Sequence, residues 1–407
     1  MRLLIIGIFL ATSAFRFFTM YLTYSMRNAP LPENVKDVFD AETYKKNQAY
    51  KMDNLKFSII TGVVSTIVLL AYLLVNFHFG LYNFIISYTE NLILTSLFIF
   101  IVPLIISNVL STLMDIYDTF VIEERYGFNN TTPATFIIDF FKMLLITLVI
   151  GAGLLSLFVF MYSQMGDLVF LAYFFVLVAF MVFMAFISPF LLRIIYKFTP
   201  LEEGELKEKI EALAIKTGYK LKGIYMVDAS KRSTKLNAFA TGFGKTKTIG
   251  LFDTLTEKMT NDEIVSILAH EIGHAKKHHI LKQFPFNLVT MSIILAAAYF
   301  IVTMPEASQA FGFPYANLAF GIFVLFIMIT PIMIILRIPS NIISRKFEYE
   351  ADAFEKEISG KEVAISAIKK LYREDLGNLT PHPFVVMLEY SHPTLTQRVA
   401  AFERDES

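Results

Sequence analysis

The chain has 407 residues, of which 55% are hydrophobic and 18% are charged, whereas a soluble domain carries roughly 25% charged residues. Lys plus Arg and Asp plus Glu both total 36, so no net charge points to a nucleic-acid partner. The absence of cysteine excludes disulfides, thiol catalysis and Cys-ligated metals, so any bound metal must be held by histidines and carboxylates.

Seven apolar segments are long enough to cross a bilayer as helices, which takes ~20 residues each. They are Leu3–Tyr24, Phe57–Phe77, Leu92–Leu110, Met143–Tyr162, Leu168–Leu192, Phe286–Val302 and Leu318–Leu336. Arg2 precedes the first segment, as in a signal peptide, but Arg16 interrupts the apolar run and no small-residue cleavage pattern follows. We therefore expect a mainly α-helical, multi-pass membrane protein that keeps this first helix in the lipid bilayer.

The basic residues are distributed unevenly between the predicted loops. The loops His78–Asn91, Ser163–Asp167 and Thr303–Asn317 contain no Lys or Arg, whereas the loop between the first two segments contains six. Because basic loops stay in the cytoplasm, we predict that the N-terminus lies outside and that the polar segments Arg193–Pro285 and Arg337–Ser407 are cytoplasmic. The lack of cysteine and of an obvious organelle-targeting extension favours a bacterial inner membrane, with the endoplasmic reticulum membrane as the alternative.

The first polar segment contains signals for a helix and for a small β element. Apolar residues at helical spacing predict a helix over Glu202–Thr217. Gly223–Asp228 and Thr248–Phe252 are expected to be short strands, with a turn at Gly242–Gly244 between them.

The same segment then contains His270, Glu271 and His274 in an HExxH pattern, on a predicted helix for which Asn261 is a possible N-cap. Residues four apart lie on one face of a helix, so both histidines can bind one Zn²⁺. Glu271 lies beside the first histidine, where its carboxylate can take a proton from water. The pattern is typical of zinc metallopeptidases; the alternative is an exposed helix with two incidental histidines.

A catalytic zinc needs a third protein ligand, and two residues compete for that role. His278 extends the helical face by another turn, but it would lie about 12 Å along the axis from His270, too far for a compact site. Glu348 is the better candidate. If its surroundings are helical, Asp352 lies one turn further on the same face and can accept the free ring N–H of a ligating histidine. Glu350 points off that face and is expected on the surface.

This combination of membrane spans, HExxH and the Glu348…Asp352 pair resembles the type I CAAX prenyl proteases, which are membrane zinc metallopeptidases of the gluzincin type. Other segments similar to that family are Glu124–Asn129, Lys197–Leu201, Lys231–Ser233, Asn237–Phe239, Leu251–Leu255 and Ser391–Pro393, followed by Arg398. The chain departs from the family where Leu236-Asn237-Ala238-Phe239 replaces the usual Ser-Asn-Ala-Tyr.

The resemblance implies a barrel of seven membrane helices around an intramembrane chamber, with the zinc facing into it. It also implies that Asn237 contacts the substrate backbone, that His392 hydrogen-bonds the oxyanion of the tetrahedral intermediate, and that Arg398 belongs to the site. Without the resemblance, Asn237 would be interpreted as a turn residue, His392 as the start of a helix and Arg398 as a surface residue.

Together these observations predict a membrane-integral zinc metalloendopeptidase with one Zn²⁺ per chain. Its substrates are expected to be prenylated CAAX-type or other membrane-associated peptides. We expect an N-terminal membrane region over residues 1–200, with five spans, and a metallopeptidase region over 201–407, with the last two. The alternatives are a quality-control protease with no prenyl requirement and, from another class, a transporter or receptor regulated by a metal.

Overall fold

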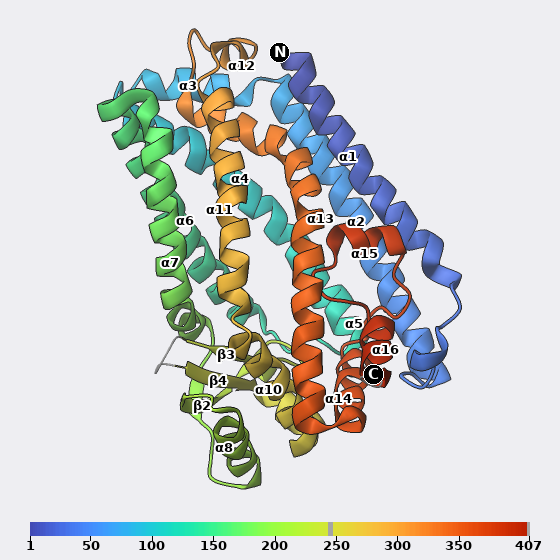
Figure 1. The fold of residues 1–407 in the computed structure, drawn as a ribbon. Coiled ribbons are helices and arrows are strands. Elements are labelled where there is room, and N and C mark those ends of the chain that lie inside the picture. The colour runs from blue at the N-terminus through green and yellow to red at the C-terminus, as the bar shows by residue number, and fades with distance from the viewer. Residues whose placement is uncertain (243–246, 405–407) are drawn as a thin grey trace.

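The computed structural model describes residues 1–242 and 247–404, and it consists mainly of helices with one small sheet at one end (Figure 1). The predicted turn at Gly242–Gly244 lies partly outside these residues, so only Gly242 can be compared; its φ of 95° is left-handed, a conformation that glycine adopts without strain.

Within the described residues, six continuous helical stretches are long and apolar enough to cross a membrane. One of them, 133–195, contains two helices that are joined at Gly166–Leu168 and lie side by side (Figure 1). The long helices are α1 (Arg2–Ser25), α2 (Ala41–Leu74), α4 (Leu92–Tyr117), α6 (Pro133–Met165), α7 (Val169–Ile195), α11 (His279–Val302) and α13 (Leu318–Ser359). The predicted apolar segments correspond to these helices in order.

Several of these helices extend beyond the predicted segments. α2 begins at Ala41, where the carboxylate of Asp40 accepts the N–H of Thr43, and α13 continues to Ser359. Hydrophobicity marks only the apolar length of a helix, so its polar continuation is not apparent from composition. One predicted loop is also partly wrong, because 77–86 forms the short apolar helix α3 (Phe77–Ile86).

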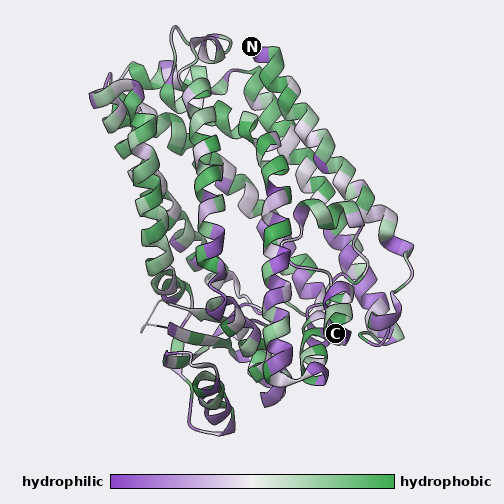
Figure 2. Ribbon diagram, in the orientation of Figure 1, coloured by the Kyte–Doolittle hydropathy of each residue, from purple (hydrophilic) through white to green (hydrophobic). Residues whose placement is uncertain are grey.

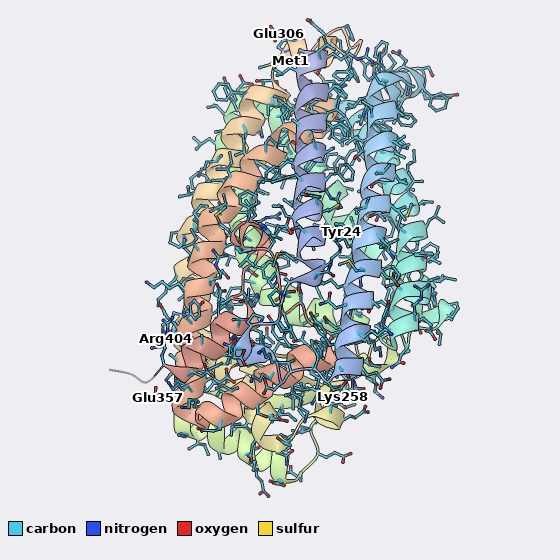
Figure 3. All side chains as sticks on the ribbon, turned by 90° about the vertical axis from the view of Figure 1, so that its right-hand side faces the viewer. Met1, Tyr24, Lys258, Glu306, Glu357 and Arg404 are labelled. Atoms are coloured by element: carbon cyan, nitrogen blue, oxygen red, sulfur yellow. The ribbon has the colours of Figure 1, made fainter. Side chains whose placement is uncertain are left out.

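The two ends of the helical body differ in polarity. Hydrophobic residues dominate the long helices, whereas hydrophilic residues gather at the end that holds the sheet and the C-terminal helices (Figure 2). Met1 and Glu306 lie together at the apolar end, and Lys258, Glu357 and Arg404 lie at the opposite end (Figure 3). The predicted loops that lack Lys and Arg are therefore at the opposite end of the molecule from the polar segments that contain them.

The sheet has the strand order β1-β2-β4-β3. Its strands are β1 (Phe198–Pro200), β2 (Leu221–Val227), β3 (Ala238–Thr241) and β4 (Lys247–Phe252). β2 and β4 pair in parallel, and both outer strands are antiparallel to their neighbours, which leaves β3 at one edge. Gly250 of β4 lies opposite Phe239, and a Cβ there would lie 2.4 Å from the phenyl ring, which would then have to move. β2 and β4 confirm the two predicted strands.

The shorter helices that follow the first strand are α8 (Glu205–Thr217), α9 (Asp253–Lys258), α10 (Asn261–Lys276), α14 (Lys361–Glu374), α15 (Pro383–Glu389) and α16 (Leu395–Glu403). Of these, α8, α9 and α10 contact the sheet, whereas α14, α15 and α16 pack against α13. One buried cluster joins Val35 and Ile122, from the N-terminal half, to Leu395, Val399 and Phe402 of α16. The two halves of the chain therefore share a core, which holds the C-terminal helices against the base of the membrane helices.

Candidate active site

The HExxH segment lies on α10, a helix with a well-formed start. The hydroxyl of Thr260 accepts the N–H of Glu263, and the carboxylate of Glu263 accepts the N–H of Thr260, which makes a capping box. The N-cap is therefore Thr260, because its side chain pairs with Glu263. Asn261, the expected cap, is instead the first residue of the helix. Ile264 and Leu268 are fully buried and fix this helix against the core.

Glycine allows α10 to approach α13 closely. A Cβ at Gly273 would lie 3.3 Å from the Cα of Ala351 and 3.2 Å from the ring of Phe354. Real side-chain contacts are rarely this tight, so a larger residue would push the two helices apart. The glycine inside the HExxH segment thus brings Glu348 of α13 up to the two histidines of α10.

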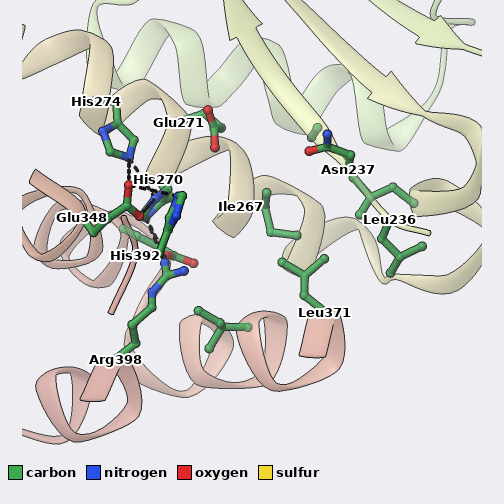
Figure 4. Close-up of a pocket in the computed structure, with 14 residues that line it drawn as sticks. Leu236, Asn237, Ile267, His270, Glu271, His274, Glu348, Leu371, His392 and Arg398 are labelled. Atoms are coloured by element: carbon green, nitrogen blue, oxygen red, sulfur yellow. Dashed lines mark hydrogen bonds and ion pairs between the residues drawn. The ribbon is translucent and has the colours of Figure 1, made fainter. Parts of the chain in front are cut away.

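His270, His274 and Glu348 converge on one point (Figure 4). The Nε2 atoms of the two histidines are 3.1 Å apart, and each is 3.3 Å from an oxygen of Glu348. Tetrahedral zinc with bonds of about 2.0–2.1 Å separates its ligand atoms by roughly 3.3 Å. The Oε2 atom of Glu348 is buried without a hydrogen-bond partner among the described residues. The donor types, their spacing and this orphaned oxygen all fit a bound metal ion.

Asp352 and Arg398 stand behind His270. The Oδ1 atom of Asp352 is 3.0 Å from Nδ1 of His270, on the side of the ring that faces away from Glu348. Arg398 donates from Nε to the other oxygen of Asp352 at 2.9 Å and from Nη2 to the first. The structure therefore brings both predicted residues to the site, and Arg398 does not lie on the surface.

Sequence reasoning missed a second carboxylate beside His270, that of Glu355. Glu355 is 3% exposed, and its Oε2 atom is 3.5 Å from Nδ1 of His270. The hydroxyl of the fully buried Ser266 donates to Glu355 at 2.7 Å. Glu355 lies one turn after Asp352 on the same helical face, so continuing that face along α13 could have found it.

Glu271 and His392 line the pocket of about 290 Å³ that contains the three donors. Burial raises the pKa of the Glu271 carboxyl. The Nε2 atom of His392 is 3.4 Å from Oε1 of Glu348, and its Nδ1 atom is 3.0 Å from the hydroxyl of Ser391. Both side chains therefore face the space beside the three donors.

The other end of the pocket is apolar and ends at the edge strand. Its aliphatic lining includes Leu236, Ile267, Ile368 and Leu371. Asn237 is exposed at the start of β3, and Figure 4 shows it across the pocket from the histidines.

The backbone before Asn237 is anchored by a carboxyl group. Asp375 accepts the N–H of Leu236 at 3.1 Å, and burial raises the pKa of Asp375 to about 6. This anchor holds the chain at the point where it enters β3.

Two other predictions can be compared with the structure. His278 is not a ligand candidate here, because α10 ends at Lys276 and His278 is exposed with a left-handed φ of 55°. Glu350 was expected on the surface; its side chain is 30% exposed, and it also lies 3.1 Å from Nε2 of His279. His279 itself was missed, because the break at His278 interrupts the helical spacing that would have pointed to it.

Comparison with known proteins gives matches along nearly the whole chain. The family model described as CAAX prenyl protease N-terminal, five membrane helices, matches residues 20–193, and that of peptidase family M48 matches residues 200–406. CAAX prenyl protease 1 of Saccharomyces cerevisiae is 32% identical, covering 99% of this chain and 95% of the yeast protein. The human CAAX prenyl protease 1 homolog is 29% identical, covering 92% and 88%. The crystal structure of S. mikatae Ste24p matches with a TM-score of 0.94 at 28% identity, covering 99% of both chains.

Proposed function

This chain belongs to the type I CAAX prenyl proteases of peptidase family M48, and we propose from this membership that His270, His274 and Glu348 hold one Zn²⁺. The protein is a multi-pass membrane metallopeptidase that acts on peptide substrates. The observation that supports this metal site best is the convergence of His270, His274 and Glu348 in the pocket that also contains Glu271: the two Nε2 atoms are 3.1 Å apart, and each is 3.3 Å from one of the two oxygens of Glu348.

The proposed chemistry is the hydrolysis of a peptide bond. When bound, Zn²⁺ supplies a Lewis acid that polarises the scissile carbonyl and lowers the pKa of water towards ~7. Glu271 accepts a proton from the attacking water and delivers it to the leaving amine. Its place in the same pocket, one residue after His270, suits this role.

We assign supporting roles to His392, Arg398 and Asp352. The contact between the Ser391 hydroxyl and Nδ1 of His392 suits the tautomer with the proton on Nε2, which can then donate to the oxyanion. Asp352 accepts the N–H of His270 and is itself held by Arg398.

The substrate is proposed to be an extended peptide that adds a strand to the free edge of β3. Main-chain hydrogen bonds to an edge strand hold a peptide regardless of its side chains, and Asn237 at the start of β3 would contact the backbone near the scissile bond. The aliphatic wall of Leu236, Ile267 and Leu371 fits an apolar side chain next to that bond, as in a CAAX sequence. The relatives are named CAAX prenyl proteases, and we propose a prenylated substrate on that ground.

Product identification by mass spectrometry tests this substrate. A farnesylated CAAX peptide and its unprenylated counterpart are incubated with the purified protein, with a Glu271→Gln variant as the blank. We expect kcat/KM to be higher for the farnesylated peptide by about tenfold or more, because burying even two methylene groups is worth that factor. Equal cleavage of both peptides would reject the prenyl requirement and leave the quality-control protease. Family membership favours neither that alternative nor a metal-regulated transporter or receptor.

We also propose that the metallopeptidase end faces the cytoplasm of a cell membrane, and that the functional boundary lies near residue 200. The basic loops support this orientation. Because the chain lacks cysteine, single cysteines at exposed positions report it directly. In intact cells, a membrane-impermeant maleimide should label Ser87→Cys and Glu306→Cys at once, but Glu357→Cys only after permeabilisation. The reverse labelling pattern would place the peptidase end outside the cytoplasm.

A further inference from the structure

A buried histidine stands directly behind His274. The Nδ1 atom of His279 is 2.8 Å from Nδ1 of His274, and the two rings meet edge to face with centroids 4.9 Å apart. His279 is 4% exposed. It is the first residue of α11, and the left-handed conformation of His278 turns the chain so that this ring returns under the end of α10.

Two residues of α13 hold the ring of His279 in place. Phe347 stacks on it with the centroids 4.4 Å apart and the planes 9° apart. Glu350 lies 3.1 Å from Nε2 of His279 and also accepts from Lys282 at 3.4 Å. One ring nitrogen of His279 therefore contacts Nδ1 of His274, and the other contacts the carboxylate of Glu350.

This arrangement fixes where the protons lie. An ionised carboxylate only accepts, so Nε2 of His279 must donate to Glu350. A neutral imidazole has one N–H, so Nδ1 of His279 is an acceptor and takes the N–H from Nδ1 of His274. His274 is then unprotonated at Nε2, the atom that lies 3.3 Å from Glu348.

We propose that Glu350 and His279 form a hydrogen-bond relay that holds His274 in the tautomer and orientation in which Nε2 ligates the metal. This inference rests on the proposed metal site. Both are positioning residues, because neither touches the metal or the substrate. The relay does for His274 what Asp352 does for His270, and it joins α10, α11 and α13 behind one ligand.

Metal affinity of the purified full-length protein tests the relay, with Zn²⁺ competed against a chelator. Glu350→Ala should weaken Zn²⁺ binding by about 10–100-fold, the usual cost of losing a partner of a ligating histidine. Glu357→Ala is the matched control, because Glu357 is exposed on the same helix, and it should bind Zn²⁺ like the wild type. Thermal unfolding of the metal-free proteins should be alike for all three, since Glu350 is only half-buried.

Replacing His279 with Asn distinguishes the relay from a merely structural role. The amide oxygen of Asn accepts from His274 without needing a partner of its own. His279→Asn should therefore keep most of the affinity, and adding Glu350→Ala to it should change the affinity by less than about threefold. The same Glu350 change costs about 10–100-fold in the His279 background.

Two results would overturn the relay: unchanged Zn²⁺ affinity in Glu350→Ala, or an equal loss on adding Glu350→Ala to wild type and to His279→Asn. Failure of the metal site itself gives a different result. In that case the wild type would bind no Zn²⁺ at this site, or His270→Ala would bind it equally well.

Discussion

Glu271→Gln should retain about one Zn²⁺ per chain and lose peptidase activity by roughly 10²–10⁴-fold, the usual contribution of a general base. The change replaces one carboxylate oxygen with an amide nitrogen, so it removes the proton acceptor and leaves the shape of the side chain. The three proposed ligands are untouched, because Glu271 lies beside them in the pocket and is not one of the converging donors. Turnover of a fluorogenic peptide and zinc content are measured on the same preparation.

The control for this experiment is Glu357→Gln, the same chemical change at an exposed position of α13. It should leave both turnover and zinc content at wild-type values. Full activity in Glu271→Gln would reject Glu271 as the general base, whereas loss of zinc in that variant would show that Glu271 also helps to hold the metal.

Glu348→Ala should lose both metal and activity. This residue supplies the third donor, and a site with only two histidines no longer closes around the ion. Zinc content should fall from about one per chain to near zero after dialysis against a weak chelator, and peptide turnover should fall to the level of the blank. The carboxylate also lies 3.3–3.4 Å from His270, His274 and His392, so thermal unfolding of the metal-free variant is measured to show that the protein is still folded.

The matched comparison is Asp352→Ala on the same face of α13. It removes a partner of His270 but no ligand, so zinc binding should weaken by about 10–100-fold and still be measurable. If Glu348→Ala bound zinc at wild-type affinity, Glu348 would not be a ligand and the third donor would have to come from elsewhere.

Local patterns predicted the parts of this molecule that depend on neighbouring residues in the sequence. The apolar runs located the long helices, and HExxH located two histidines one turn apart on α10. Glu348 could be found because Asp352 follows it at helical spacing and the family resemblance places such a pair beside HExxH. The cap of α10 was missed by one residue, because Thr260 and Asn261 are both good N-caps and only the partner Glu263 decides between them.

The contacts between distant helices could not be predicted in this way. His279 and Glu350 are 71 residues apart, and they meet only because α11 and α13 pack side by side. Glu355 reaches His270 through the close approach of α10 and α13 at Gly273. A single sequence gives the spacing along each helix but not the face that each helix turns to its neighbour.

The helix that carries Glu348 is also a candidate membrane span, and it contains two prolines, Pro331 and Pro339. Each proline lacks a backbone N–H and so removes one hydrogen bond of the helix. A bend in α13 is therefore expected at these two positions. Below them, Asn341 donates to the carbonyl of Leu388, and Arg345 donates to two further carbonyls around α15. The lower part of α13 is thus clamped to α15, and the part above the prolines is buried among α1, α4 and α11. Glu348 is therefore carried by a helix that is held at two levels, among the membrane helices above the prolines and against α15 below them.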